Sequence, residues 1–394
     1  MTVGKGYLTI AGVGAESPYG TEAVVTQQVK TLQWEINDVY QNLLDESLVG
    51  YNVHLPPDVG VLDITGPWRA DLTYTLADLL LKHFMGDLAS GLYSFQSDLV
   101  GDGLTWAINK QVSVAAAIGV KIPQMVFNLA PGGCSLSGTA IATAFTRAST
   151  TNTSAILAAL PPNVDRRCKF APDLRVRLGL ASAALGSGDT LDGGTTRGGL
   201  TQGTVTMTRA MAQTHIAGQR GILEPDEDNF VDGQIALTLA RYSTDQFKTW
   251  AASKTQLALE LLFTKEGGGG TRQLVVPGLT ITDAPNPVGG PGFVPQTIAA
   301  TVNAHQVVYA AATISAAASD NSINDSAAGF PFLYPGAGLI VEGFTGTAAN
   351  NAAYTVVSRT TTKIILSGGT LVNDAAGETV TIIGRDLPMF ITET

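Results

Sequence analysis

Two glycines near the N-terminus follow a short apolar run, as the glycines of a dinucleotide-binding turn do. The run LTIA leads directly into Gly12 and Gly14. A dinucleotide-binding turn also needs a third glycine three residues later and a helix whose N-terminus receives the pyrophosphate. Position 17 is Ser17, and the following VVT run favours a strand. The pattern therefore argues against a nucleotide site, although Glu35 stands where a ribose-binding acid would be expected.

The densest acidic stretch is EPDEDNFVDG, residues 224–233, and it invites comparison with a calcium-binding loop. Such a loop places oxygen ligands at alternate positions, turns at a glycine and adds a distal glutamate. Asp226, Asp228 and Asp232 stand in a different register. We therefore predict a solvated turn, with a weak calcium site as the alternative.

The other reactive side chains are scattered along the chain. The histidines and cysteines are His54, His83, His215, His305, Cys134 and Cys168. The sequence contains neither an HExxH nor a GxSxG pattern, and GGCSLSG around Cys134 is interpreted as a buried thiol where two strands approach closely. The EGGGG run lacks the Lys and Ser or Thr of a phosphate-binding loop. We predict no catalytic residue, no cofactor-binding residue and no metal ligand, so no enzyme activity is expected.

Composition and charge narrow the function further. The 394 residues are 45% hydrophobic and only 14% charged, with a net charge of −10. A core of useful size can therefore be buried, while the longest basic run is the pair Arg166 and Arg167, too short for free nucleic-acid binding. Two cysteines without a disulfide framework suggest synthesis in a reducing compartment. The absence of a signal segment and of a long apolar run predicts a soluble, cytoplasmic product that does not insert into membranes.

The elements that would position these residues are mostly strands with period-two patterning. In DLRVRLGL, for example, Leu174, Val176 and Leu178 share one face. The TNTSAILAAL run at 151–160 is predicted as another strand, and TRQLVVPGLTITDAP as a strand pair interrupted by Pro277.

Two helices are predicted among the strands. One covers 76–86 and ends at Gly86, and the other lies in YSTDQFKTWAAS, with Ser243 or Thr244 as its N-cap and with Phe247 and Trp250 facing inward. Residues 181–200 and 265–272 are predicted as glycine-rich loops. The chain is thus expected to be mainly β and antiparallel, with one or two flanking helices.

A change in composition near residue 310 predicts a second module. We expect a domain at 1–309, completed in one alternative by a returning strand at 385–394, and a small all-β accessory module at 310–384. The module is expected to be Ig-like or barrel-like, with a tight hairpin connection at residues 359–362.

The order of these segments resembles the major tail tube proteins of tailed bacteriophages. The resemblance rests on GVGAESPYGTEAVVT at 12–26, on DVGVLDITGPWRADLTYTLADLLLKHFMG and on EPDEDNFVDGQIALTLARYSTDQFKTWAA. The C-terminal segment from INDSAAGF to AAGETVTI resembles a small module that is often appended to phage tail proteins.

The resemblance implies a structural virion protein with a β-sandwich or barrel-forming fold. Six copies would close into a ring, and stacked rings would form a tube through which viral DNA is ejected without specific binding. The implied partners are copies of the same chain and other tail proteins, such as the tape measure, tail terminator and distal tail proteins. The protein would belong to the virion tail and would assemble in the host cytoplasm. A neutral or negative wall would let DNA slide, because basic side chains would retain its phosphates.

Two alternatives remain open at this stage. One is a β-rich tail-tip or adhesin-like protein that binds host surface glycans through exposed aromatics. Its candidate residues in the C-terminal module are Phe330, Phe332, Tyr334 and Phe344. The other is an enzyme that uses the turn at Gly12 and Gly14.

Overall fold

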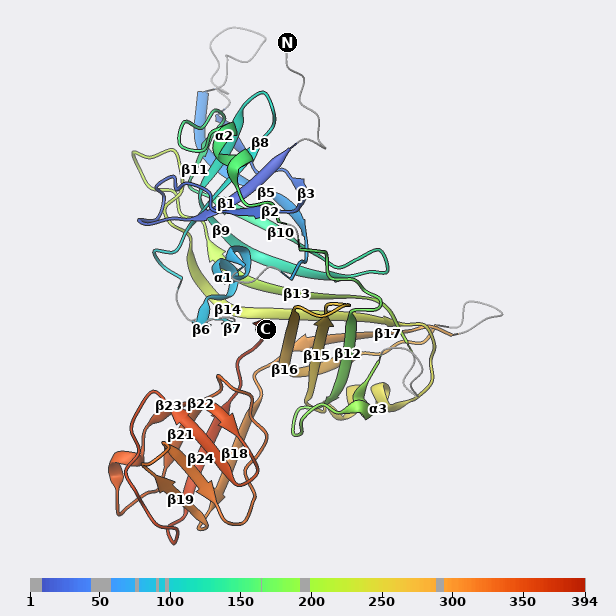
Figure 1. The fold of residues 1–394 in the computed structure, drawn as a ribbon, viewed down its shortest axis with the longest axis vertical. Coiled ribbons are helices and arrows are strands. Elements are labelled where there is room, and N and C mark those ends of the chain that lie inside the picture. Colours follow the sequence, from blue (N-terminus) through green and yellow to red (C-terminus); the bar gives the residue numbers. More distant parts are fainter. Residues whose placement is uncertain are drawn as a thin grey trace, which may run out of the picture. The chain divides into compact units, whose positions relative to one another are not determined.

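The computed structural model describes residues 9–43, 58–74, 78–89, 92–95, 99–163, 165–191, 199–287 and 294–393. The chain divides into two compact units. Unit 1 comprises Met1–Pro172 and Thr204–Asp232, and unit 2 comprises Asp173–Gly203 and Gly233–Thr394. Both consist of antiparallel strands with a few short helices (Figure 1), which confirms the expectation of a mainly β protein.

Unit 1 is built from short strands at its N-terminal end and long strands through its core. Its strands are β1 (Ile10–Ala15), β2 (Gln27–Val29), β3 (Thr31–Trp34), β4 (Asn37–Leu43), β5 (Asp58–Asp71), β6 (Asp87–Ala89), β7 (Leu92–Ser94), β8 (Leu104–Asn109), β9 (Val114–Leu129), β10 (Ser135–Ala142) and β11 (Ala144–Thr146). Two further strands, β13 (Leu200–Ala212) and β14 (Asp226–Leu239), begin in one unit and end in the other.

Strand β9 belongs to two sets of paired strands. Its first part pairs with β8 and β11, and its second part pairs with β10, which in turn pairs with β5. The change falls near Gly119, whose φ of 65° lies in the left-handed region. A Cβ at this position would lie 2.2 Å from Thr143 Oγ1, so both the backbone angle and the space require glycine. Gly119 is therefore the corner at which the chain passes from one set of strands to the other.

The helices of unit 1 confirm one prediction and correct another. Helix α1 (Leu79–Met85) starts at the N-cap Asp78, whose side chain accepts from Leu80 N, and ends at Gly86, as expected. Residues 151–160 do not form the predicted strand, because α2 (Ser154–Ala159) lies there. Thr153 caps α2 by accepting from Ile156 N, which satisfies an N–H group that a helix start leaves without an intrahelical partner. Leu157 is its buried anchor.

The first part of unit 2 is an antiparallel sheet with one helix. Its elements are β12 (Leu174–Leu180), α3 (Gln246–Ser253), β15 (Leu257–Thr264), β16 (Thr271–Asp283), β17 (Gln296–Val302) and β25 (Phe390–Glu393), together with a short helical turn at Ser187–Asp189. A second short helical turn, Ala348–Asn350, lies in the C-terminal module. Strand β12 buries Leu174, Val176 and Leu178 on one face, as predicted. The residue before α3 is Asp245, so neither predicted cap residue starts it, while Phe247 and Trp250 are buried as predicted.

Two predicted interruptions are absent from these strands. Strand β16 runs through Pro277 without a break, and the register of its pairing with β15 shifts between Leu257 and Leu259. A bulge accommodates proline because proline has no N–H to give to the ladder. Residues 224–233 were predicted as a solvated turn, and this is wrong, since β14 begins at Asp226 and includes the rest of this stretch.

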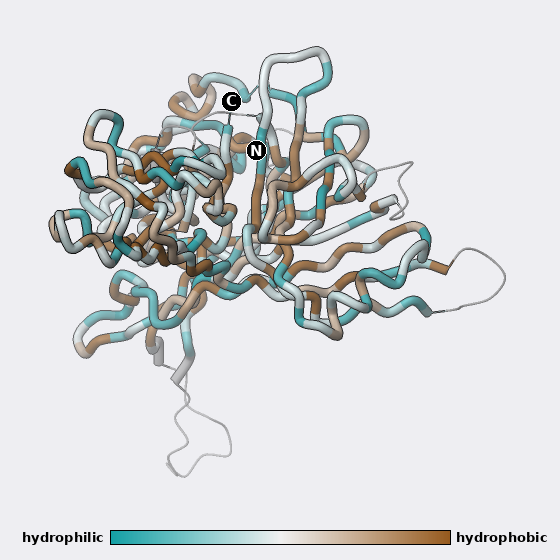
Figure 2. The backbone as a smooth tube through the Cα atoms, turned by 90° about the horizontal axis from the view of Figure 1, so that it is seen from below, coloured by the Kyte–Doolittle hydropathy of each residue, from teal (hydrophilic) through white to brown (hydrophobic). Residues whose placement is uncertain are grey.

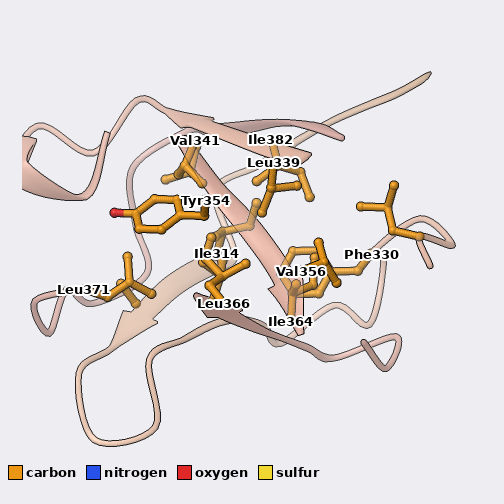
Figure 3. Packing of buried hydrophobic residues seen from close by; sticks show 14 of the residues in the cluster. Ile314, Phe330, Leu339, Val341, Tyr354, Val356, Ile364, Leu366, Leu371 and Ile382 are labelled. Carbon is orange, nitrogen blue, oxygen red and sulfur yellow. The ribbon is translucent and has the colours of Figure 1, made fainter. Parts of the chain in front are cut away.

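The C-terminal module forms a separate seven-stranded antiparallel half-barrel, drawn in orange and red in Figure 1. Its strands are β18 (Gln306–Ala311), β19 (Ile314–Ala317), β20 (Ser322–Asp325), β21 (Gly338–Glu342), β22 (Ala353–Arg359), β23 (Lys363–Ser367) and β24 (Val380–Arg385). Leu339, Tyr354, Val356 and Ile364 point into a common apolar core (Figure 3). The hairpin between β22 and β23 occupies residues 360–362, as expected.

After the half-barrel the chain returns to the first sheet of unit 2. Strand β25 pairs with β16, and Arg272 stands opposite Glu393 in this pairing. The two side chains form an ion pair and are almost completely buried. The half-barrel is thus inserted between β17 and β25, and its two connections meet where His305 Nδ1 contacts Asp386 Oδ2 at 2.6 Å.

A buried carboxylate organises the INDSAAGF stretch of the half-barrel. Asp325 is 1% exposed and accepts from Tyr309 OH, Thr313 Oγ1, Ala327 N and Gly329 N at 2.6–2.9 Å. Burial acts to raise the pKa of Asp325, but these four donors outweigh it and hold the pKa at about 2. The ionised carboxylate therefore fixes the turn that follows β20.

Replacing Asp325 by Asn is expected to lower the free energy of unfolding of the half-barrel by about 2 kcal/mol at pH 7, because an amide group would face an N–H donor. The folded pKa is below the unfolded value, so this advantage of the wild type is present above pH 4 and shrinks as the pH falls toward 2. Calorimetric melts at pH 7 and pH 3 measure it. Asp320→Asn, at a half-exposed surface ion pair with Lys363, is the control and should change little. Equal effects of both variants would contradict this role.

Candidate functional site

The glycines that suggested a nucleotide turn serve close packing in unit 1. A Cβ on Gly14 would lie 2.4 Å from Val24 O, and one on Gly12 would lie 2.6 Å from Leu160 Cδ1. Strand β1, which carries both residues, pairs with β2 and β8. The segment therefore needs small residues to fit its own neighbours, and its strand continues into a turn rather than a helix.

The turn after β1 fixes the corner of β9. The carboxylate of Glu16 accepts from Gly119 N, Gly20 N and Thr105 Oγ1, each at 2.8 Å. Tyr19 OH donates to Gly119 O at 2.8 Å. Both backbone polar groups of the corner residue are thus satisfied by side chains from one turn. We call Glu16 and Tyr19 the corner clamp.

The electrostatics of the corner clamp follow from its burial. Glu16 is 7% exposed, and this desolvation raises its pKa above the ordinary value despite the three hydrogen bonds. Lys121 Nζ lies 5.0 Å from the Tyr19 ring centre and pairs with Glu224 at 2.8 Å. Burial likewise raises the pKa of Tyr19. The side chains of Glu16 and Tyr19 are thus engaged in hydrogen bonds that hold the corner, which is a structural role.

A neutral polar surface covers one face of the long strands in unit 1. Strands β9, β10 and β13 turn large apolar side chains, such as Phe127, Leu136 and Met207, to the buried face. Their half-buried residues on the opposite face are Gln124, Val126, Asn128, Ser137, Thr139, Thr204, Thr206 and Thr208. None of these eight side chains is ionisable. We call this set the unit 1 neutral face.

Hydrogen bonds between side chains tie the strands of the unit 1 neutral face together. Gln124 Nε2 donates to Thr208 Oγ1 at 3.2 Å, and Asn128 Nδ2 donates to Ser137 Oγ at 2.8 Å. Part of the face is a shallow hollow of about 400 Å³. Arg69, its single charged residue in the described part of the chain, donates to Ser135 Oγ. The face is therefore smooth, hydroxyl- and amide-rich and almost free of charge.

Unit 2 carries a similar face on β14 and β17. Gln234, Ala236 and Thr238 stand opposite Thr301, Ala299 and Thr297 on the outer side. The alternate residues, including Ile235, Leu237 and Ile298, are buried. Figure 2 shows hydrophilic and hydrophobic residues following one another along the backbone of the chain as a whole. We call these six outer residues the unit 2 neutral face.

The acidic stretch forms an exposed strip along the first half of β14. Asp226, Asp228, Phe230 and Asp232 occupy alternate positions and are all exposed, with Phe230 at 91%. The neighbouring acids point elsewhere: Glu227 pairs with the fully buried Arg209 at 2.7 Å. We call the four exposed residues the Phe230 strip. The three aspartates thus lie along a strand, and no group of three or more His, Cys, Asp or Glu side chains in the described ranges could hold a metal ion.

The structure does not bring the histidines of the described ranges together. His83 Nδ1 contacts Leu79 O, and burial lowers its pKa. His215 contacts Asp63 in unit 1, whereas His305 contacts Asp386 in unit 2. His54 lies outside the described residues. Cys134 is fully buried, as expected for a thiol between closely packed strands.

The aromatics considered for glycan binding belong mainly to the interior of unit 2. Phe330 and Phe344 are 2% and 1% exposed. Phe332 and Tyr334 are half-buried and stack edge to face at 4.8 Å, and Tyr334 also contacts Phe390. These residues stabilise the half-barrel and its connection to β25, so they do not form an open aromatic platform.

Sequence reasoning missed the residues that matter most at these surfaces. Glu16 and Tyr19, the corner clamp, belong to the segment at 12–26 that resembles tail tube proteins. No pattern in the sequence predicts that Glu16 reaches Gly119. The neutral faces did leave a signal: strands β13 and β17 read TVTMT and TIAAT, with threonine or alanine at alternate positions. Phe230 left a weaker signal, because an aromatic residue among five acids is unusual in a solvated turn.

The comparison with known families assigns the chain to a class. Residues 6–302 match the family described as phage tail tube protein. This match covers most of the chain, so the protein belongs to that family, which is structural and non-enzymatic. Membership implies that the chain assembles with copies of itself and is part of the virion tail. A comparison with curated proteins found no match. Within the described ranges, no helix has the length and apolarity needed to span a membrane.

Replacing Glu16 by Gln is expected to lower the free energy of unfolding by about 1–3 kcal/mol, because the amide group would oppose one of three converging donors. Urea denaturation followed by tryptophan fluorescence measures the change. Glu35→Gln is the matched control, since Glu35 is exposed and its carboxylate accepts from the neighbouring Gln33 side chain. A Glu16 variant as stable as the control would show that the corner clamp is not needed.

Proposed function

We propose that this chain closes into rings of six copies, that the rings stack into the phage tail tube, and that viral DNA passes through the tube during ejection. Family membership supports assembly with copies of itself. The number six and the stacking come from the resemblance described above. The observation that carries the proposal further is the pair of neutral faces, because a conduit for a polyanion needs a wall with few cations.

The neutral faces are proposed as the wall of the channel. Each lysine or arginine that meets a phosphate releases counterions and adds affinity, so a cationic wall would hold DNA in place. Hydroxyl, amide and methyl groups offer no such attraction. The chain has 23 Lys and Arg residues, yet none is among the fourteen residues that define the two neutral faces. Arg69, which lines the hollow of the unit 1 neutral face, donates to Ser135 Oγ. The faces also bury their reverse sides in apolar cores, so they are rigid enough to form a wall.

The Phe230 strip is proposed as a contact between copies. A phenylalanine that is 91% exposed on a strand leaves a large apolar side chain in water. Aromatic residues in this position are typical anchors of protein interfaces. A ring needs such heterologous contacts, in which one surface of a copy meets a different surface of the next.

The domain assignment is part of the proposal. Residues 1–309, completed by 385–394, would form the tube domain, and 310–384 would form a decoration module outside the wall. The pairing of β25 with β16 supports the returning strand. The tape measure, tail terminator and distal tail proteins are the proposed partners at the lumen and the tube ends. Assembly is proposed to take place in the host cytoplasm.

Negative-stain electron microscopy of the purified full-length chain tests the proposal directly. We expect rings and hollow tubes at high protein concentration. A chain that stays monomeric under all conditions, in the presence of a native tail extract as seed, would overturn it.

Replacing Phe230 by Ser should raise the protein concentration needed for tube formation roughly tenfold or more, as expected for loss of an aromatic anchor. Sedimentation and electron microscopy measure it. Val308→Ser is the control, because Val308 is 63% exposed but lies on the half-barrel. Unchanged assembly of the Phe230 variant would remove the strip from the interface and leave the tube proposal standing.

Introducing Lys at both Gln234 and Ala236 should leave tubes intact but make them retain double-stranded DNA. Retention should fall by about 10³-fold or more between 50 and 200 mM salt if six or more phosphates are contacted. Co-sedimentation of DNA with tubes measures it. Glu at the same two exposed positions is the matched control and should not retain DNA. If the two charge variants behave alike, this face does not line the channel.

A further inference from the structure

The two cysteines of the chain meet in unit 1, although 33 residues separate them. Cys134 N donates to Cys168 O at 3.0 Å, Cys168 N donates to Leu72 O at 2.7 Å, and Leu72 N donates to Cys134 O at 3.2 Å. The three residues therefore form a closed ring of backbone hydrogen bonds. Cys134 and Cys168 are both 0% exposed, and no disulfide joins them in this structure.

The spacing of the two backbones suits a disulfide. With standard bond lengths, the hydrogen bond of 3.0 Å from Cys134 N to Cys168 O holds the two Cα atoms no more than about 7 Å apart. Disulfide-bonded cysteines have Cα atoms about 4.4–6.8 Å apart, so the two backbones are close enough for this bond. Contacts beside the pair show the same closeness: a Cβ on Gly133 would lie 2.4 Å from Arg167 Cδ, and Arg167 Nη1 donates to Gly132 O.

A virion passes from a reducing cytoplasm to oxidising surroundings, and this change can act on the two cysteines. A buried thiol remains inert in a reducing cytoplasm, whereas virion surfaces are exposed to oxidising surroundings. Family membership places this chain in the virion tail. The pair would therefore be made as thiols and would meet an oxidant after the particle leaves the cell.

We propose that Cys134 and Cys168 form an intramolecular disulfide after release of the virion. The oxidant is a small-molecule disulfide. The thiolate of one cysteine attacks it and releases one small thiol, and the thiolate of the second cysteine then attacks the mixed disulfide and releases another. The two cysteines together lose two electrons and two protons, and the oxidant is reduced to two thiols. Because both cysteines are buried, the first step occurs when the turn at 131–134 opens transiently.

The disulfide would close a loop that contains strand β10 and helix α2. The start of β10, which contributes Ser137 and Thr139 to the unit 1 neutral face, would then be fixed covalently to residues 166–168. Closing such a loop lowers the conformational entropy of the unfolded chain and so stabilises the folded protein. The oxidised protein is expected to melt on the order of 5–10 °C higher than the reduced protein.

The test uses the purified full-length chain incubated with oxidised glutathione for several days, and in parallel refolded in a glutathione redox buffer. We expect peptide mass spectrometry without reduction to find the Cys134 and Cys168 peptides linked within one chain, and the melting temperature to rise until dithiothreitol reverses it. Cys134→Ala and Cys168→Ala, treated in the same way, should give neither the linked peptide nor the shift.

Three results would overturn the proposal: two intact thiols after both treatments, disulfides only between chains, or a linked protein that melts lower than the reduced one. The mass-spectrometric result does not depend on rings or tubes. It therefore separates failure of this inference from failure of the proposed tube.

Discussion

The corner of β9 at Gly119 is the constraint on which unit 1 depends. One continuous strand serves two sets of neighbours, so the backbone must turn where it is fully buried. A turn of this kind leaves an N–H and a C=O without strand partners, and such groups are costly to bury unpaired. Glu16 and Tyr19 satisfy both groups. The N-terminal segment that resembled a nucleotide turn is therefore the part that makes the corner stable.

The distribution of charge explains how smooth faces arise on a chain with 23 basic residues. Lys121 pairs with Glu224 and Arg209 with Glu227, and both cations are almost completely buried. Arg272 is likewise paired inside, with Glu393 on the returning strand. A buried cation needs a carboxylate partner, and these pairs consume part of the basic charge in the interior. The alternate positions of β9, β10, β13, β14 and β17 remain available for hydroxyl, amide and methyl groups.

Much of the fold could be predicted from local patterns. Alternation predicted β12 and its buried face, the spacing of leucines before Gly86 predicted α1, and the change in composition near 310 predicted a further group of strands. Three predictions of strands and turns were wrong for identifiable reasons. Helix α2 depends on the cap at Thr153 and on the burial of Leu157. The strand at 226–232 depends on pairs such as Arg209 with Glu227. The continuity of β16 depends on a bulge in its pairing with β15.

The sequence by itself determined the class of the protein: a β-rich, weakly charged chain whose ordered segments resemble tail tube proteins and whose reactive residues are too scattered for catalysis. These properties depend on composition and on short-range periodicity, which each segment carries alone. Only the tertiary structure decided that Glu16 reaches Gly119, that Cys134 meets Cys168, and that β25 returns to β16. Each of these contacts joins residues far apart in the chain, and strand pairing, which no single segment encodes, brings them together.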